Sequence, residues 1–181
     1  PTSGTNANKV LIPSGQTLDT SAAGLVTPAG HVLQVKQYVM SAKQVVASAT
    51  YVDVLTLAIT PSSTSNKILI NFSLSVGSAG GGEGTHIQIE RGGTAIGVGD
   101  VRGNRGRAFT VCGEQTGDDA MGSASGMYLD SPSSTSSLTY TIAVHGWAGA
   151  YPVNINSTGN DTNSANYSSC VSTITLQEIQ G

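Results

Sequence analysis

The chain carries little charge. Only 10% of its 181 residues are Asp, Glu, Lys or Arg, against roughly 25% in an average soluble protein. Serine, threonine and glycine are abundant instead, so hydroxyl groups rather than charges keep the protein in solution. This composition fits an extracellular or virion-surface β protein better than a cytosolic enzyme. The formal net charge of −3 argues against general nucleic-acid binding, which depends on neutralising phosphates.

Long apolar runs are absent as well. No stretch reaches the roughly 18 consecutive apolar residues that a membrane-spanning helix requires, so we expect no membrane insertion. The N-terminus lacks the basic flank and the apolar segment of a signal peptide. A start at Pro1 fits the loss of an initiator Met. We therefore expect a small, complete gene product that is assembled in the cytoplasm of its host.

Residues that form disulfides or bind metals are scarce. The two cysteines are Cys112 and Cys170, and in a protein assembled in the cytoplasm we expect free, buried thiols, with a disulfide as the alternative. The histidines, His31, His86 and His145, have no neighbouring His or Cys at ligand spacing. The sequence therefore predicts no metal site and no cofactor. It also contains no catalytic motif with the context that such a motif needs.

What the chain does have is a repeated pentad. Pro-Ser-Ser-Thr-Ser occurs at residues 61–65 and again at 132–136, and each copy precedes a run in which apolar and polar residues alternate, 68–76 and 138–145. Proline fixes φ and Ser/Thr hydroxyls bond nearby backbone, so the pentad predicts a surface turn. Period-two alternation predicts a strand with one face in a core. In the second run this places Thr141 and Ala143 in solvent.

The remaining segments extend this pattern to an all-β protein. Strands are predicted at residues 31–39, 51–60, 85–91, 94–98, 107–112, 127–129, 151–155 and 171–179. The first of these also has valines at heptad spacing, so a helix is the alternative there, although branching at Cβ favours a strand. Loops are predicted at residues 77–84, 113–126 and 156–169. We expect an antiparallel, jelly-roll-like β-sandwich over residues 31–181, whose edge strands trimer packing would cover.

Residues 1–30 differ from the rest of the chain. They contain three prolines and only short apolar groups such as Val10, Leu11 and Ile12. We interpret them as an extended N-terminal arm that becomes ordered by lying on a neighbouring molecule. The alternative is a flexible terminus.

All four arginines fall within a short window: Arg91, Arg102, Arg105 and Arg107. Arginine makes bidentate hydrogen bonds to carboxylates and phosphates. One interpretation is an anchor for an acidic surface or an anionic glycan. The other is a hairpin whose arginines pair with Asp100 and neighbouring acids.

Two further features are weaker candidates for binding. Trp147, the only tryptophan, follows His-Gly and either stacks on a sugar ring or, more commonly for a lone tryptophan in such a strand, fills core or interface. Asp118, Asp119 and residues 160–163 offer oxygen atoms to a calcium ion, but neither group has the alternating acidic pattern of a calcium loop.

Four stretches carry a resemblance to a known group of proteins. They are Leu-Val-Thr-Pro-Ala-Gly-His-Val-Leu-Gln-Val at 25–35, Ile-Thr-Pro-Ser-Ser-Thr-Ser-Asn-Lys-Ile-Leu-Ile at 59–70, Ile-Glu-Arg-Gly-Gly-Thr at 89–94, and residues 128–140. Together they resemble a domain of tailed-bacteriophage virion proteins, found in tail-fibre heads and capsid-surface proteins. The resemblance implies a compact β-sandwich, often trimeric, with no enzymatic role and no catalytic residues.

The size of the chain then favours one function within that group. A long fibre needs a shaft and a baseplate-anchoring domain, and 181 residues leave room for an arm alone. We expect a homotrimeric capsid decoration (cement) protein on the virion surface, bound to the major capsid protein or other virion proteins. The alternative is the receptor-binding head of a tail fibre that contacts host surface glycans. A glycosidase, which would need two carboxylates about 5–9.5 Å apart, and a secreted lectin-like module are further alternatives.

Overall fold

A computed structural model shows how the chain folds. It describes residue 14 and residues 28–78, 84–113, 117, 119–146 and 152–181. These residues form eleven strands and no helix, and they therefore include no helix able to cross a membrane. The strands are β1 (Val32–Met40), β2 (Gln44–Val46), β3 (Val52–Ile59), β4 (Lys67–Ser78), β5 (Thr85–Arg91), β6 (Thr94–Ile96), β7 (Thr110–Cys112), β8 (Met121–Asp130), β9 (Leu138–His145), β10 (Val153–Ile155) and β11 (Ser172–Ile179).

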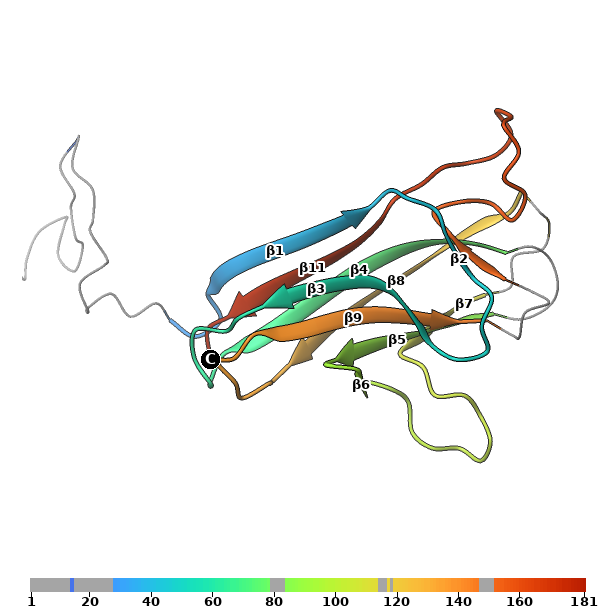
Figure 1. Ribbon diagram of the computed structural model, residues 1–181. Helices are drawn as coiled ribbons and strands as arrows, with labels where there is room; N and C mark the ends of the chain where they lie inside the picture. The colour runs from blue at the N-terminus through green and yellow to red at the C-terminus, as the bar shows by residue number, and fades with distance from the viewer. Residues whose placement is uncertain (1–13, 15–27, 79–83, 114–116, 118, 147–151) are drawn as a thin grey trace, which may run out of the picture.

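The strands form two antiparallel sheets that pack as a sandwich (Figure 1). The first sheet has six strands in the order β1-β11-β4-β10-β2, with β8 on the other edge of β4. The second has five, in the order β3-β9-β5-β6, and β7 also pairs with β5. The predicted all-β class and antiparallel sandwich are confirmed. The helix alternative for residues 31–39 is excluded, because β1 pairs with β11 along its length.

The core lies between the inward faces of the two sheets. The alternation after the first pentad is confirmed: the inward residues of β4, Ile68, Ile70, Phe72, Leu74 and Val76, are at most 1% exposed. Facing them from β9 are Tyr140, Ile142 and Val144, which are fully buried. Each large apolar side chain buried in this way stabilises the fold by about 1.5–3 kcal/mol.

The alternation predicted for β9 is wrong on its outward face. Thr141 and Ala143 are buried, although the pattern placed them in solvent. The reason is that β9 is a central strand, flanked by β3 and β5. The neighbours of Ala143 in these strands are Asp53 and Gln88, whose longer side chains stand on either side of the small one.

The loop predicted at residues 113–126 is wrong for its last six residues. They belong to β8, which pairs with β4 from Met121↔Gly77 to Asp130↔Ile68. Glycine commonly marks a turn, but Gly126 pairs with Phe72 inside the strand, and the close approach of aromatic rings requires glycine there. A Cβ at this position would collide with Phe109 and Phe72. Gly77 likewise belongs to β4, where it pairs with Met121 and Asn154. A Cβ there would collide with the Ser157 carbonyl.

Other strand boundaries differ by a few residues. The strand predicted at 94–98 ends at Ile96, because Gly97 has a φ of +67° that starts a loop. The strand predicted at 107–112 begins only at Thr110. The three-residue strand β2 (Gln44–Val46), which pairs with β10, was not predicted.

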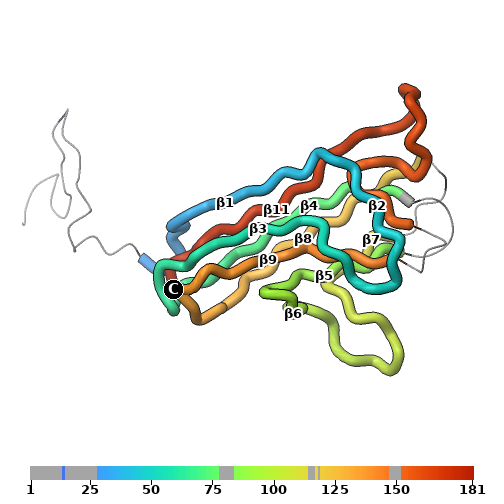
Figure 2. The backbone as a smooth tube through the Cα atoms, viewed as in Figure 1, coloured from blue at the N-terminus to red at the C-terminus, as the bar shows by residue number. Residues whose placement is uncertain are grey.

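Both pentad turns lie at the end of the sandwich that holds the C-terminus (Figure 2). The chain that precedes β1 is fastened to the same end. Gly30 N donates a hydrogen bond to Gln180 O at 2.7 Å, and Gln180 N donates one to His31 O at 2.8 Å. All but a few residues of the predicted arm, residues 1–30, lie outside the described part of the chain.

Candidate functional site

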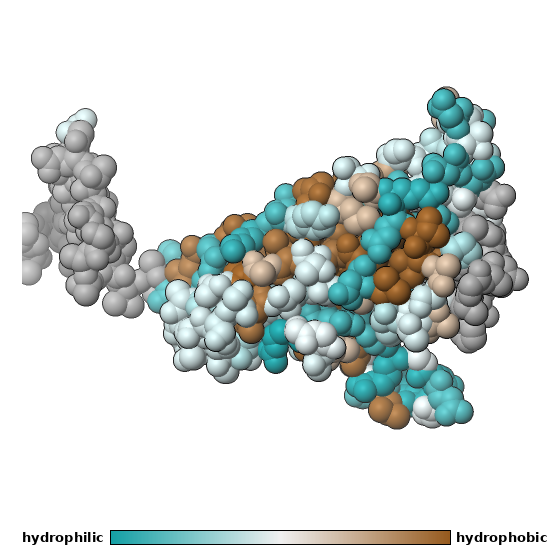
Figure 3. Space-filling view, in the orientation of Figure 1, coloured by the Kyte–Doolittle hydropathy of each residue, from teal (hydrophilic) through white to brown (hydrophobic). Residues whose placement is uncertain are grey.

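The arginine cluster resolves into one loop and one separate residue. Residues 97–109, here called the basic loop, connect β6 to β7 and project from the second sheet (Figure 1). They carry Arg102, Arg105 and Arg107, all exposed. In Figure 3 this projection is mostly hydrophilic. Arg91 lies elsewhere, at the other end of β5, because β6 pairs with the end of β5 and β7 with its start.

The backbone of Arg107 fastens the basic loop to the sheet. Its carbonyl oxygen accepts hydrogen bonds from Tyr51 Oη at 2.9 Å and from Gln88 Nε2 at 2.9 Å. Its Nε donates to Gly99 O at 2.6 Å and so closes the loop across its base. Burial raises the pKa of Tyr51. The hydrogen bond with Gln88 offsets part of this rise, and the nearby charge of Glu90 adds to it. The Tyr51 hydroxyl therefore keeps its proton, and its role as donor, at neutral pH.

A short aromatic stack supports the loop from below. The ring of His145 lies 4.5 Å from that of Tyr51, edge to face, and 4.7 Å from that of His86 (centroid distances). Gly106 passes over His86 so closely that a Cβ there would lie 2.8 Å from the His86 Cε1 atom. The part of the basic loop at Gly106 and Arg107 is thus held against the outer face of the second sheet, and the rest of the loop projects from it.

No carboxylate of the described residues forms an ion pair with the guanidinium groups of this loop. Within the described ranges, ion pairs shorter than 4 Å join Lys43 to Asp161 and Arg91 to Asp130, and no others occur. Asp100, the expected alternative partner, therefore pairs with none of the three arginines. A pocket of about 480 Å³ opens beside them, lined by Arg102, Arg105, Arg107, Asp100 and Phe109 among others. Three exposed cations beside a pocket suit an anionic surface or ligand.

Arg91 has a structural partner. Its Nη1 donates to both carboxylate oxygens of Asp130, at 3.0 Å and 2.7 Å, and the Tyr140 hydroxyl donates to the same carboxylate at 2.7 Å. The hydrogen bond with Asp130 raises the pKa of Arg91. Burial raises the pKa of Tyr140, and the bond to Asp130 adds to it. Arg91, Asp130 and Tyr140 together join β5 and β9 of one sheet to β8 of the other. Arg91 therefore stabilises the fold and is not part of a binding surface with the three arginines of the basic loop.

A second buried carboxylate, Glu178, holds the first pentad turn. Its Oε1 accepts from Ser62 N at 2.6 Å, Ser62 Oγ at 2.8 Å and Asn66 Nδ2 at 2.5 Å, and its Oε2 accepts from Gln34 Nε2 at 2.6 Å. Burial would raise the pKa of Glu178, but these hydrogen bonds, that from Gln34 first, outweigh it and lower the pKa below its ordinary value.

Glu178 and Asp130 flank Ile68 in the register of the first sheet, two strand spacings or about 10 Å apart. Glycosidase carboxylates stand about 5–9.5 Å apart with substrate between them. Here a buried isoleucine lies between the two, and donors of the protein occupy both carboxylates. This pair therefore serves the fold.

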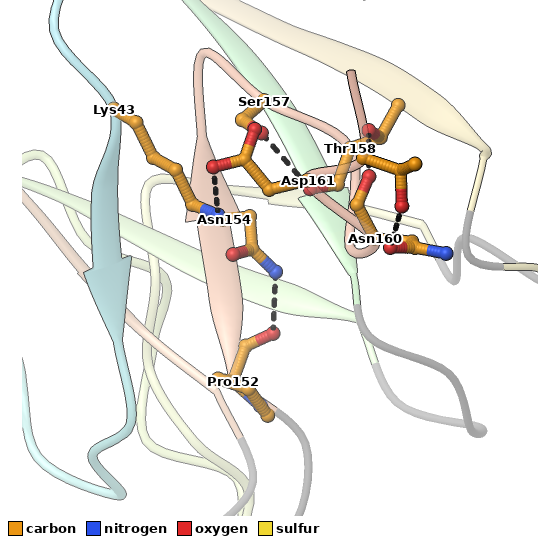
Figure 4. A network of polar contacts seen from close by, with 8 residues as sticks. Lys43, Pro152, Asn154, Ser157, Thr158, Asn160 and Asp161 are labelled. Atoms are coloured by element: carbon orange, nitrogen blue, oxygen red, sulfur yellow. Dashed lines mark hydrogen bonds and ion pairs between the residues drawn. The ribbon is translucent and has the colours of Figure 1, made fainter. Parts of the chain in front are cut away.

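A separate polar loop, residues 156–170, borders a pocket of about 310 Å³. Its lining includes Asp161, Asn163, Tyr167 and several hydroxyls. Lys43 forms an ion pair with Asp161 at 3.2 Å, and Thr158 Oγ1 donates to Asn160 O at 2.7 Å (Figure 4). Lys43 competes with any cation for Asp161. Among the described residues, no three or more His, Cys, Asp or Glu side chains gather as metal ligands would.

The remaining predicted residues divide into two sets. Val10, Leu11, Ile12 and Trp147, together with Asp118, lie outside the described residues. Cys112 and Cys170 form no disulfide, as predicted, and Cys112 is buried. The predicted burial is wrong for Cys170, which is partly exposed in the polar loop.

Two buried residues outside the predicted candidate sites are structurally central. Asn156, with a φ of +65°, is 2% exposed and donates to Met40 O and Ala42 O at 2.8 and 3.0 Å. Its Oδ1 accepts from Ser172 Oγ at 2.6 Å. Glu178 is the other. It lies at an inward position of the alternating run 172–179, and a buried acid needs hydrogen-bond donors around it. That position in the pattern could have identified Glu178 from the sequence.

Comparison with known proteins adds no assignment. No protein-family model matches the sequence, and no curated protein matches it significantly.

Proposed function

We propose that this protein is a non-enzymatic component of the virion surface of a tailed phage, a jelly-roll-like trimer that decorates the outer capsid and binds the major capsid protein. The observation that carries the proposal is the basic loop: three exposed arginines without carboxylate partners in the described structure, held on a rigid sheet. A symmetric shell presents the same acidic site many times. Weak contacts of several subunits then act together.

The buried acids support a structural role. Asp130 and Glu178 are 7% and 1% exposed and are occupied by protein donors. Neither borders the pocket beside the basic loop or the one beside the polar loop. The sandwich thus uses both carboxylates in its own structure: Asp130 joins strands of the two sheets, and Glu178 holds the first pentad turn.

Reversing the charge of the basic loop tests the proposal. We expect the double variant Arg102→Glu, Arg105→Glu to bind capsids that lack this protein at least tenfold more weakly, because like charges replace complementary ones. Cosedimentation with such capsids over a range of salt concentrations measures the change. Arg107 is left intact because its Nε closes the loop.

The matched control is Arg102→Lys with Arg105→Lys, which keeps the charge and should retain most of the affinity. Wild-type binding should also weaken as salt rises, since exposed charges are screened. Equal binding by the Glu variant and the wild type would remove the basic loop from the capsid contact.

The N-terminal arm makes a second prediction. Deleting residues 1–27 keeps the bonds of Gly30 and His31 to Gln180, so the sandwich should fold with unchanged thermal stability. We expect capsid affinity to fall at least tenfold, because the arm is proposed to lie across adjacent capsid subunits. Full retention of binding by the truncated protein would contradict this role.

A receptor-binding head is the second candidate function, and the polar pocket of residues 156–170 favours it. Hydroxyls, an amide, a carboxylate and the ring of Tyr167 line that pocket, and such groups suit hydrogen bonding and stacking with a sugar. A glycan array with the purified protein distinguishes the two. Saturable glycan binding that Tyr167→Ala abolishes, without affinity for capsids, would favour the receptor-binding head.

A further inference from the structure

The outward face of the first sheet is unusually poor in charge. The register aligns residues of β1, β11, β4 and β8 in rows across it: Val35, Gln177, Leu69 and Leu129 in one, Gln37, Thr175, Asn71 and Met127 in the next, then Val39, Thr173, Ser73 and Ser125. No carboxylate stands in these rows. The nearest charge on this face is Lys67, at its end, where it pairs with Ile179.

Large apolar side chains are exposed on this same face. Met127 is 63% exposed, Val35 57%, Val39 49% and Leu129 47%. The outward face of the second sheet is different, since it bears Asp53, Glu90 and two histidines and is partly covered by the basic loop. Depletion of charge together with exposed methionine and aliphatic residues marks the central part of protein interfaces.

We propose that this face is the surface through which copies of this chain pack against one another. The inference rests on the proposed function, in which the protein is a trimer, and it assigns the residues that meet. In a closed trimer each copy meets two neighbours around the axis. An uncharged face suits both contacts, because neither brings like charges together. Burying it also leaves the basic loop accessible, since that loop lies on the opposite side of the sandwich.

The area of the face agrees with such a contact. Four strands about 4.8 Å apart, each with about eight residues at about 3.4 Å, cover about 500 Å² in projection. The accessible area is larger than the projection because side chains protrude. A stable interface buries about 800 Å² on each partner. With its protruding side chains the face supplies an area of that order for one contact. Because each copy in a closed trimer has two neighbours, surface beyond this face is buried as well.

The edge of β1 with which no described strand pairs is a less suitable contact than the face. β1 (Val32–Met40) is the outermost strand of its sheet, and apolar side chains gather along it in Figure 3. Symmetric antiparallel pairing of two copies about the centre of this strand would set Lys36 opposite Lys36. Like charges directly opposite each other destabilise a strand pair. Lysine on an edge strand is a common protection against this kind of association.

Lysine substitutions on the face provide the test. Met127→Lys and Leu129→Lys place a charge at exposed positions, so each variant should fold with the thermal stability of the wild type. Sedimentation equilibrium at about 50 μM should give the wild type a mass of about 55 kDa, three times the 18.3 kDa of the chain. Each variant should shift to the monomer mass. The matched control, Ala58→Lys on the exposed face of β3, should keep the wild-type mass.

The outcomes separate this interface from the proposed function. A dimer that the lysine variants dissociate would support the interface and contradict the trimer. A wild-type monomer would overturn the interface, and the same proteins tested for capsid binding would then show whether the capsid covers this face instead. An oligomer that both lysine variants leave intact would also overturn it. A further outcome is that the lysine variants dissociate the oligomer while the wild-type protein binds no capsid. That result would uphold the interface and refute the decoration role.

Discussion

Replacing Glu178 with alanine should lower the free energy of unfolding by about 2–4 kcal/mol. The carboxylate is 1% exposed and accepts four hydrogen bonds, from Ser62, Asn66 and Gln34. Its removal leaves the buried Asn66 amide without this acceptor and detaches the first pentad turn from β11. For a domain of this size, thermal unfolding should occur about 5–15 °C lower. Differential scanning calorimetry at neutral pH measures the shift.

Glu178→Gln is the matched variant. It keeps the shape and one acceptor oxygen, so Ser62 and Asn66 retain a partner and the loss should be smaller, about 1–2 kcal/mol. A loss in the alanine variant below about 0.5 kcal/mol would show that water replaces the carboxylate at this site.

The lowered pKa of Glu178 also sets a pH dependence. A carboxylate whose pKa is lower in the folded state contributes stability above its unfolded pKa, and the contribution is lost as pH falls through the folded pKa. Acidification below the ordinary value of 4.5 should therefore reduce the stability of the wild type more than that of Glu178→Gln. Urea unfolding of both proteins between pH 6 and pH 3 measures this. Parallel curves would contradict the assignment.

The sequence predicted the fold class because local patterns largely determine it. The run after the first pentad alternates without interruption, and β5 (Thr85–Arg91) was predicted with its observed bounds. Strand order and register were not predictable, because they depend on partners far away along the chain. The burial of Thr141 and Ala143 follows from the central position of β9, which no local pattern reports.

The candidate site was predicted only in part, because it too depends on residues that are distant along the chain. Clustering of arginines along the chain identified the basic loop, but it also included Arg91, which the β5–β6 hairpin carries to the other end of β5. The anchor of the loop came from Tyr51 and Gln88, which are distant in sequence and carry no motif. The glycines of β8 were wrongly predicted to lie in a loop. Glycine is favoured both in turns and where aromatic rings approach the backbone closely, and the sequence alone does not distinguish these two cases.

That close approach makes Gly126 a position of large expected effect. It pairs with Phe72 in the register of β4 and β8, and a Cβ there would lie 2.7 Å from the Phe72 Cε1 atom and still nearer to Phe109. Phe72 is 1% exposed and cannot move without displacing its core neighbours. We expect Gly126→Ala to cost about 1–3 kcal/mol by overpacking, and Gly126→Val to cost more.

Gly113→Ala is the matched control, because a Cβ there would meet no atom of the described residues within 4 Å and its φ is not positive. That change should be neutral or slightly stabilising, since it restricts the unfolded chain. Combining Gly126→Ala with Phe109→Leu should recover part of the loss, because the smaller side chain makes room for the new methyl group. The coupling between the two changes, measured by urea unfolding of both single variants and the double variant, separates a steric cause from a change in strand propensity. Strictly additive losses would show that the rings do not limit this position, and the glycine would then need another explanation.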